Sequence, residues 1–134
     1  MRAVLDVNVL VSGAAKGTGS PRRLLEAWLE GHFELIVSAQ LIDELTRVLA
    51  YPKVRRLVNP SQAERLLALL ERVELTDDPA DPPPVVPPDP DDVYLVALAA
   101  SAHAILVTGD RGVISLREQI PVMTPPEFLE LLGY

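Results

Sequence analysis

The stretch Ala3-Val-Leu-Asp-Val-Asn-Val-Leu-Val11 decides the fold, because it is an apolar, β-branched run interrupted only by Asp6 and Asn8. Such a run is typical of a strand buried on both faces of a parallel sheet. If the strand continues through Val11, as the apolar residues favour, the alternation of side chains puts Asp6 and Asn8 on one face. If the strand ends at Leu5, Asp6 begins a turn instead.

Outward from this run, predicted strands and helices alternate, a pattern typical of α/β proteins. Ser20 followed by Pro21 predicts the N-cap and first residue of a helix that Gly31 ends, and Ser38 predicts the cap of the next one. We therefore expect a single domain over residues 1–134, with a central, mostly parallel β-sheet of about five strands flanked by helices. The predicted strands are 3–11, 33–37, 73–76, 104–108 and 122–123. The predicted helices are 21–30, 39–51, 91–102 and 126–132, with a further helix that opens at Pro60 and includes Leu66 to Leu70. Residues 77–90 hold much of the proline and are expected to form an extended, stiff loop.

Composition excludes several classes of protein. The chain has 134 residues, a formal net charge of −7 and no cysteine, so a disulfide scaffold, a thiolate zinc site and a cysteine nucleophile are excluded. No apolar run approaches the ~18 residues of a membrane span, so we expect a soluble, cytoplasmic protein with no membrane partner. The acidic balance argues against broad electrostatic attraction to nucleic acid, which normally depends on clustered Lys and Arg.

Four carboxylates lie where apolar residues or ligand-binding positions are expected. Asp6 interrupts the first strand, and Glu44 lies at the edge of the apolar stripe of its helix. Asp92 is in the first turn of an otherwise apolar helix and shares its buried side, whereas Asp91 is predicted to face solvent. Asp110 follows a buried strand at its carboxyl end, where ligands bind in open α/β sheets. Each also has a structural explanation, since acids are common in turns, at stripe boundaries and in first helical turns.

Taken together, the four acids predict a metal site. Two carboxylates ~4 Å apart repel by about 4 kcal/mol at an effective dielectric constant of 20, so four at one edge of a sheet would be strongly unfavourable without a cation. All-oxygen ligands select Mg²⁺ or Mn²⁺ over zinc. The two histidines, His32 and His103, have no partner at metal-ligand spacing.

With these residues in place, the sequence resembles the PIN-domain family of metal-dependent ribonucleases, in the branch of toxins of toxin–antitoxin pairs. The likeness covers essentially the whole chain. It rests on segments that occur in family order: Val4-Leu-Asp-Val-Asn-Val-Leu-Val-Ser12, Leu41-Ile-Asp-Glu-Leu-Thr-Arg-Val-Leu49, Asp89-Pro-Asp-Asp92 with the Ala97–Ala100 helix behind it, and Ile105-Leu-Val-Thr-Gly-Asp110.

The resemblance implies that Asp6, Glu44, Asp92 and Asp110 bind one or two Mg²⁺ or Mn²⁺ ions, with Asp91 as the fallback for Asp92. The family's supporting polar residues fall on Asn8, Ser12 and Thr108. Two positions depart from the family pattern, since Val7 replaces a frequent hydroxyl residue and Gly112 stands where a further acid often follows.

The implied reaction is hydrolysis of RNA phosphodiester bonds by metal-activated water, with the carboxylates holding the ions. An antitoxin partner and a homodimer are expectations of the resemblance alone. Arg22, Arg23 and Arg111 are candidates for contacts with RNA phosphates, because Arg recognises phosphate in a bidentate manner.

Two other functions remain open. One is a catalytically weak or inactive PIN-like domain that serves as an RNA- or protein-binding module. The other is a Mg²⁺-dependent phosphatase of the aspartyl-phosphate type, which needs a second Asp two residues after the first, where this sequence has Asn8.

Overall fold

The computed structural model describes all of residues 1–134 and contains a four-stranded sheet in the order β2-β1-β3-β4. Every neighbouring pair is parallel, and Leu5 pairs with Val107 at the carboxyl ends of the two central strands. The predicted α/β class and parallel sheet are confirmed, with four strands instead of about five. The strands are β1 (Arg2–Leu5), β2 (Glu34–Leu35), β3 (Ile105–Val107) and β4 (Val122–Met123).

The missing fifth strand is the segment 73–76, which was predicted from its alternating apolar residues. In the structure this segment is not a strand, and it makes one sheet-like bond, from Thr76 N to Val37 O at 2.8 Å. Because Val37 lies beyond the end of β2, the segment crosses the sheet edge and does not extend along it.

The first strand is shorter than predicted. β1 ends at Leu5, and the apolar residues that follow form helix α1 (Val7–Ala14). Asp6 caps this helix, because its Oδ1 accepts a hydrogen bond from Asn8 N at 3.3 Å and its backbone oxygen accepts from the N–H groups of Val9 and Leu10. The expectation that Asp6 and Asn8 share one face of a strand is therefore wrong.

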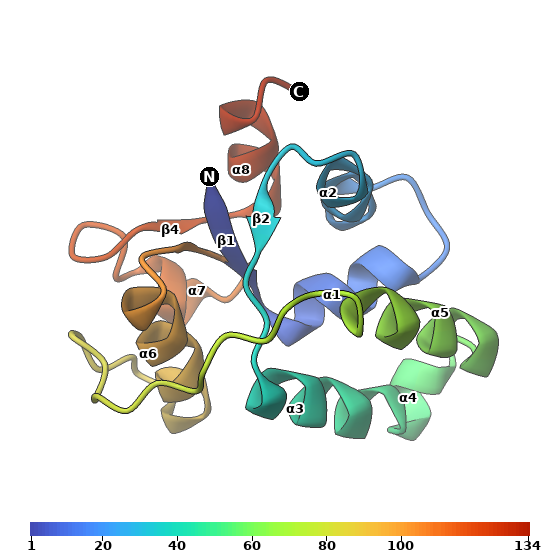
Figure 1. The fold of residues 1–134 in the computed structure, drawn as a ribbon, viewed down its shortest axis with the longest axis horizontal. Coiled ribbons are helices and arrows are strands. Elements are labelled where there is room, and N and C mark those ends of the chain that lie inside the picture. The colour runs from blue at the N-terminus through green and yellow to red at the C-terminus, as the bar shows by residue number, and fades with distance from the viewer.

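Helices lie on both sides of the sheet, with α6 on one side and α1, α2, α3 and α5 on the other (Figure 1). The short helices α4 and α7 were not predicted. The remaining helical elements are α2 (Ser20–Leu29), α3 (Ala39–Leu49), α4 (Pro52–Arg55), α5 (Pro60–Leu70), the 3₁₀ helix η1 (Pro90–Asp92), α6 (Val93–Ser101), α7 (Arg111–Ile114) and α8 (Pro125–Leu131). None of these helices has the length and apolar character that crossing a membrane requires.

The caps explain where these helices begin and end. Ser38 caps α3 as predicted, because its Oγ accepts a hydrogen bond from Leu41 N. For α2 the prediction is wrong by one residue, since Gly19 is the N-cap and Ser20 is already helical. Gly31 follows the end of α2 with a φ of +83°, a left-handed conformation that glycine adopts without strain.

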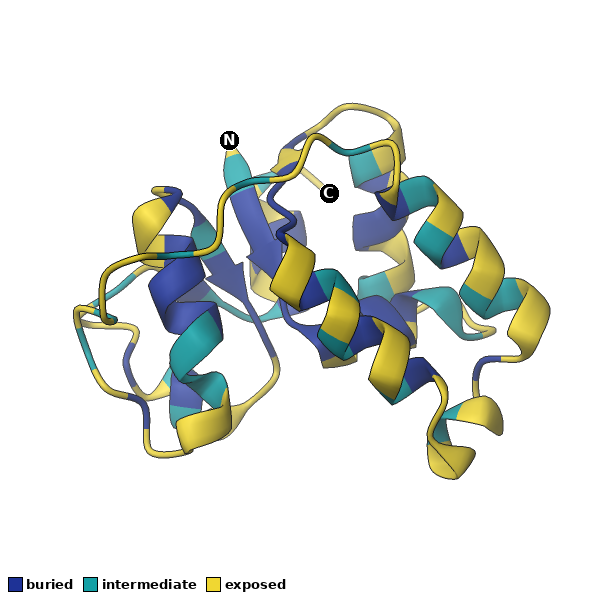
Figure 2. Ribbon diagram, turned by 60° about the horizontal axis from the view of Figure 1, so that its bottom comes forward, coloured by how far each residue is buried: buried dark blue, intermediate teal, exposed yellow.

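One continuous hydrophobic core joins the sheet to the helices. Ala3, Val4 and Leu5 of β1 are completely buried, as are Leu106 and Val107 of β3. In Figure 2 the central strands are accordingly dark blue, whereas the outer faces of the helices are yellow. Burial on both faces of the two central strands holds their carboxyl ends in fixed register.

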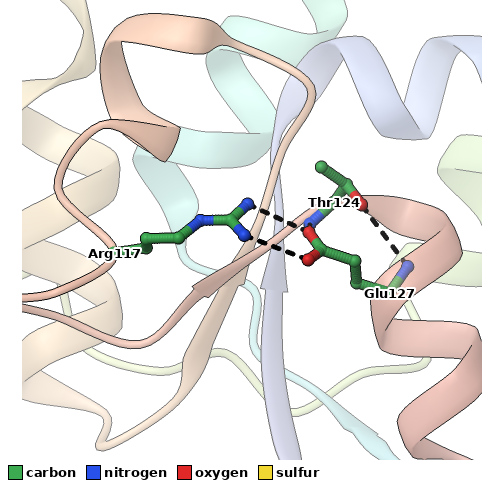
Figure 3. A network of polar contacts seen from close by, with 3 residues as sticks. All are labelled: Arg117, Thr124 and Glu127. Atoms are coloured by element: carbon green, nitrogen blue, oxygen red, sulfur yellow. Dashed lines mark hydrogen bonds and ion pairs between the residues drawn. The ribbon is translucent and has the colours of Figure 1, made fainter.

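The C-terminal helix is fixed by a polar network at its first turn (Figure 3). Glu127 and Thr124 form a capping box, and both carboxylate oxygens of Glu127 accept hydrogen bonds from Arg117 at 3.0 Å. Hydrogen bonds from the Thr124 backbone and from Arg117 lower the pKa of Glu127 to about 2. The network ties α8 to the segment between α7 and β4.

Candidate active site

Asp6 lies at the carboxyl end of β1, where the buried strand turns into α1. Its side chain is only 7% exposed and is one of three buried polar or charged residues of the chain, with Ser38 and Thr108. A buried carboxylate needs hydrogen-bond partners. Asp6 has two of them, because Oδ1 accepts from Asn8 N and Oδ2 accepts from Thr108 Oγ1 at 2.7 Å.

Thr108 connects the ends of the two central strands. It follows β3 directly, it is completely buried, and its backbone N–H donates to Met123 O. Its hydroxyl donates to Asp6 and accepts from Asp110 N at 3.1 Å. A single side chain therefore fixes the positions of Asp6 and of the turn that carries Asp110.

Asp110 is exposed and caps the short helix α7, where its Oδ2 accepts from Val113 N at 3.0 Å. The absence of a side chain at Gly112 keeps space beside this carboxylate. A Cβ there would lie 3.2 Å from Asp110 Oδ2 and 3.6 Å from Pro88 Cγ. Pro88 thus packs beside Gly112.

The two acids on helices are half-buried and lie within electrostatic range of this edge. Burial raises the pKa of Glu44, on α3, and the charge of Asp6 raises it further. Burial also raises the pKa of Asp92, to about 6, with added repulsion from Asp110 and Asp6. The charge of Asp6 therefore repels Glu44 on α3 and Asp92 on η1, and the charge of Asp110 repels Asp92. Asp6 and Asp110 thus lie at adjoining strand ends joined through Thr108, and Glu44 and Asp92 lie within reach of the Asp6 charge.

The donor chemistry of this edge, with carboxylate oxygens from four segments, fits Mg²⁺ or Mn²⁺. The side-chain positions are looser, since no group of three or more His, Asp or Glu side chains lies close enough to hold one ion. A common ion would therefore require at least one carboxylate to change its rotamer. Glu44, with three rotatable bonds and partial exposure, has the most freedom to do so.

The other polar residues that the sequence analysis named, Asp91, Asn8 and Ser12, are exposed. Asp91 is exposed on η1, and its charge raises the pKa of both Glu44 and Asp92. Asn8 and Ser12 are exposed at positions i and i+4 of α1, so they lie on one face of that helix.

Of the three arginines, only Arg111 is next to the acids, directly after Asp110. Arg22 lines a cavity of ≈ 320 Å³ between α1, α2 and α5, and it pairs with Glu26 at 3.7 Å. Arg23 lies over the ring of Tyr134, 5.8 Å from its centroid. Arg22 and Arg23 are thus engaged on α2, away from the acids.

Sequence reasoning missed one polar group beside the acids, formed by Tyr94, Ser38 and Asp78. The Tyr94 hydroxyl bonds to Ser38 Oγ and donates to Asp78 Oδ1. The available signal was weak: Tyr94 is the only aromatic residue of the otherwise aliphatic helix α6, and Asp78 stands at the start of the proline-rich segment.

Comparison with known proteins identifies the family. A model of the PIN domain matches residues 2–112. The chain is 28% identical over 141 aligned positions to the uncharacterized protein MJ1680 of Methanocaldococcus jannaschii, with 97% of this chain and 90% of that protein covered. The fold is similar to that of a chain in the crystal structure of VapBC2 from Rickettsia felis bound to a DNA fragment from their promoter. The TM-score is 0.59 at 19% identity, and 92% of this chain and 98% of that chain are covered. Because the PIN domain model matches most of its length, and because its sheet is parallel, the chain belongs to the PIN domain family.

Proposed function

We propose that this PIN domain is a Mg²⁺- or Mn²⁺-dependent endoribonuclease, in which Asp6, Glu44, Asp92 and Asp110 hold the ion. PIN domains are generally nucleases, so hydrolysis of a phosphodiester bond is the expected class of reaction. The observation that carries the proposal is the placement of Asp6 and Asp110 at adjoining strand ends, joined through the Thr108 hydroxyl, with Glu44 and Asp92 within reach of the Asp6 charge. A protein keeps such an arrangement at a cost in stability, which a bound cation offsets.

The chain's own residues orient the acids and leave one of them able to bind a proton. Thr108 fixes Asp6 through its hydroxyl, and the N–H of Val113 fixes Asp110. Asp92 has a pKa raised to about 6, so protons compete with a cation for this carboxylate below that pH. When bound, the ion would lower the pKa of a water molecule, orient the phosphate and neutralise charge on the leaving oxygen.

RNA is the proposed substrate, although the chain carries a net charge of −7. Each bound divalent cation would offset two of the four negative charges of the acid edge, where the phosphate must lie. Arg111, exposed beside Asp110, is the arginine placed to contact a phosphate there. RNA binding should accordingly be weak without the metal ion and should depend on local contacts.

We further propose that the protein is the toxin of a toxin–antitoxin pair and forms a homodimer. Support comes from the resemblance of its motifs to that branch of the family and from the similar fold in VapBC2. Copurification of a small protein encoded next to this gene, with inhibition of RNA cleavage on its addition, tests the partner directly.

The test of the activity is cleavage of a labelled single-stranded RNA in Mg²⁺, in Mn²⁺ and in EDTA. Wild type should cleave in either metal and stop in EDTA, and Asp6→Asn and Asp110→Asn should each lose most of the activity. Asp43→Asn is the matched control, since Asp43 is exposed on α3 beside Glu44. Cleavage that survives EDTA and both substitutions would overturn the proposal. Metal binding without cleavage by the folded wild type would favour the alternative of a binding module.

A further inference from the structure

A directional chain of hydrogen bonds lies beside the acid edge. The N–H of Leu41 donates to Ser38 Oγ at 3.3 Å, and Ser38 Oγ bonds to the Tyr94 hydroxyl. Tyr94 donates to Asp78 Oδ1 at 2.5 Å. Because the single hydroxyl hydrogen of Tyr94 goes to Asp78, the hydroxyl of Ser38 donates to Tyr94. The chain thus runs from the first turn of α3 to a carboxylate.

This chain joins three segments that are far apart in the sequence. Ser38 is buried at the cap of α3, the helix that carries Glu44. Tyr94 is the second residue of α6, and α6 directly follows η1, which carries Asp92. Asp78 begins the proline-rich segment, and the hydrogen bond from Tyr94 lowers its pKa.

The three segments meet where electrostatic repulsion acts to separate them. Asp6 repels both Glu44 on α3 and Asp92 on η1. Asp91, also on η1, repels Glu44. Burial and the hydrogen bond to Asp78 raise the pKa of the Tyr94 hydroxyl, and the charge of Glu44 raises it further. The hydrogen-bond chain therefore joins the two helical elements whose acids push them apart.

This connection matters for metal binding because no three of the acidic side chains lie close enough together to coordinate one ion. If the backbones of α3 and η1 are held in place, rotation of side chains is enough to gather the carboxylates. If they are free to separate, ion binding must also order the backbone, which lowers affinity.

We propose that Tyr94 is a positioning residue, whose hydroxyl, held between Ser38 and Asp78, fixes η1 and α6 against α3 and thereby sets the affinity of the acid edge for a divalent cation. The inference rests on the proposed function, because it assumes that the four acids hold an ion. It assigns to Tyr94 no contact with the ion or with RNA.

The test measures Mn²⁺ binding by isothermal titration calorimetry at pH 7.5, without RNA, on the folded full chain. For Tyr94→Phe we expect the Kd for Mn²⁺ to rise roughly three- to tenfold, the range that loss of one hydrogen bond produces. Tyr51→Phe is the matched control, since Tyr51 is 53% exposed and its hydroxyl makes no hydrogen bond. Its Kd should equal that of wild type.

Variants at Asp78 separate positioning from charge. Asp78→Asn retains an oxygen that accepts from Tyr94 and should bind Mn²⁺ nearly as wild type does, whereas Asp78→Ala should weaken binding as Tyr94→Phe does. The double variant Tyr94→Phe, Asp78→Ala should be no weaker than either single variant, because all three break the same connection.

The outcomes distinguish the two proposals. If wild type binds Mn²⁺ and both Tyr94→Phe and Asp78→Ala bind it equally well, the positioning role is overturned and the proposed function stands. Equal weakening by Asp78→Asn and Asp78→Ala would mean that charge alone acts, and this result also overturns the positioning role. If wild type itself does not bind Mn²⁺, the proposed function fails and the positioning role fails with it.

Discussion

Replacing Asp92 by Asn should stabilise the metal-free protein at neutral pH although it removes a proposed metal ligand. In the folded chain the pKa of Asp92 is raised from 3.8 to about 6, first by burial and then by repulsion from Asp110 and Asp6. At 1.36 kcal/mol per pKa unit, this difference corresponds to ~3 kcal/mol. Because Asp92 remains partly in contact with water, screening reduces the expected gain to about 1 kcal/mol.

The sign of the pH dependence follows from the raised pKa. A carboxyl group of this kind contributes stability that is fully present below its unfolded pKa of 3.8 and is lost as the pH rises through about 6. The advantage of Asp92→Asn over wild type should therefore be largest above pH 7 and fall to about a third of that value at pH 4.5. The substitution costs no helix cap, since Asp92 makes no capping hydrogen bond at the start of α6.

Urea unfolding in EDTA at pH 7.5 and pH 4.5, followed by circular dichroism, measures this difference. Asp43→Asn serves as the control, because Asp43 is exposed on α3 and should change stability by less than about 0.5 kcal/mol at either pH. If the Asp92→Asn protein is less stable than wild type at pH 7.5, or if its stability is shifted equally at both pH values, the raised pKa of Asp92 is refuted.

Two further substitutions test the packing that supports the site. Thr108→Val keeps the volume of a completely buried side chain but removes the hydroxyl between Asp6 and Asp110. It should lower the free energy of unfolding, measured in urea, by about 1–3 kcal/mol, and it should reduce the affinity for Mn²⁺. Wild-type values for both quantities would contradict the role of that hydroxyl. Gly13→Ala would place a Cβ 2.6 Å from Leu25 Cδ1, where α1 and α2 pack closely. It should lower the free energy of unfolding by about 1–3 kcal/mol in the same urea assay. An unchanged free energy of unfolding would show that Leu25 can move aside.

The nearness of Asp6 and Asp110 could be predicted because it depends on topology alone. In a parallel sheet, residues that follow neighbouring strands meet at one edge, so Asp6 and Asp110 were expected together before any side chain was placed. Glu44 and Asp92 were placed by helical periodicity. What the sequence could not provide is the distance between them, which depends on rotamers and helix positions.

The local structure at Asp6 shows the limit of pattern reasoning. A short apolar run fits a buried strand and a buried helix equally well, and the run after Leu5 is a helix because Asp6 caps it and Asn8 supplies the N–H. The same carboxylate that was expected to interrupt a strand therefore ends it. Burial of Val9 and Val11 arises from helix packing in this case.

The contacts of the proline-rich segment could not be predicted at all. Tyr94 and Ser38 are 56 residues apart, and Tyr94 and Asp78 are 16 apart across a loop without periodicity. No local rule brings these three side chains together, because their meeting depends on how α3 and α6 pack around the sheet. The same is true of Pro88, whose contact beside Gly112 appears only in the fold.

The proposed nuclease activity requires that the acids at the carboxyl ends of β1 and β3 hold a divalent cation. Anomalous diffraction from crystals soaked in Mn²⁺ tests it most directly, since it locates the ion without reference to activity. We expect an anomalous peak bounded by carboxylate oxygens of Asp6 and Asp110, with Asp92 or Glu44 turned toward it, and no such peak in Asp6→Asn crystals. The absence of any peak at this edge, at a Mn²⁺ concentration that supports RNA cleavage, would contradict the claim.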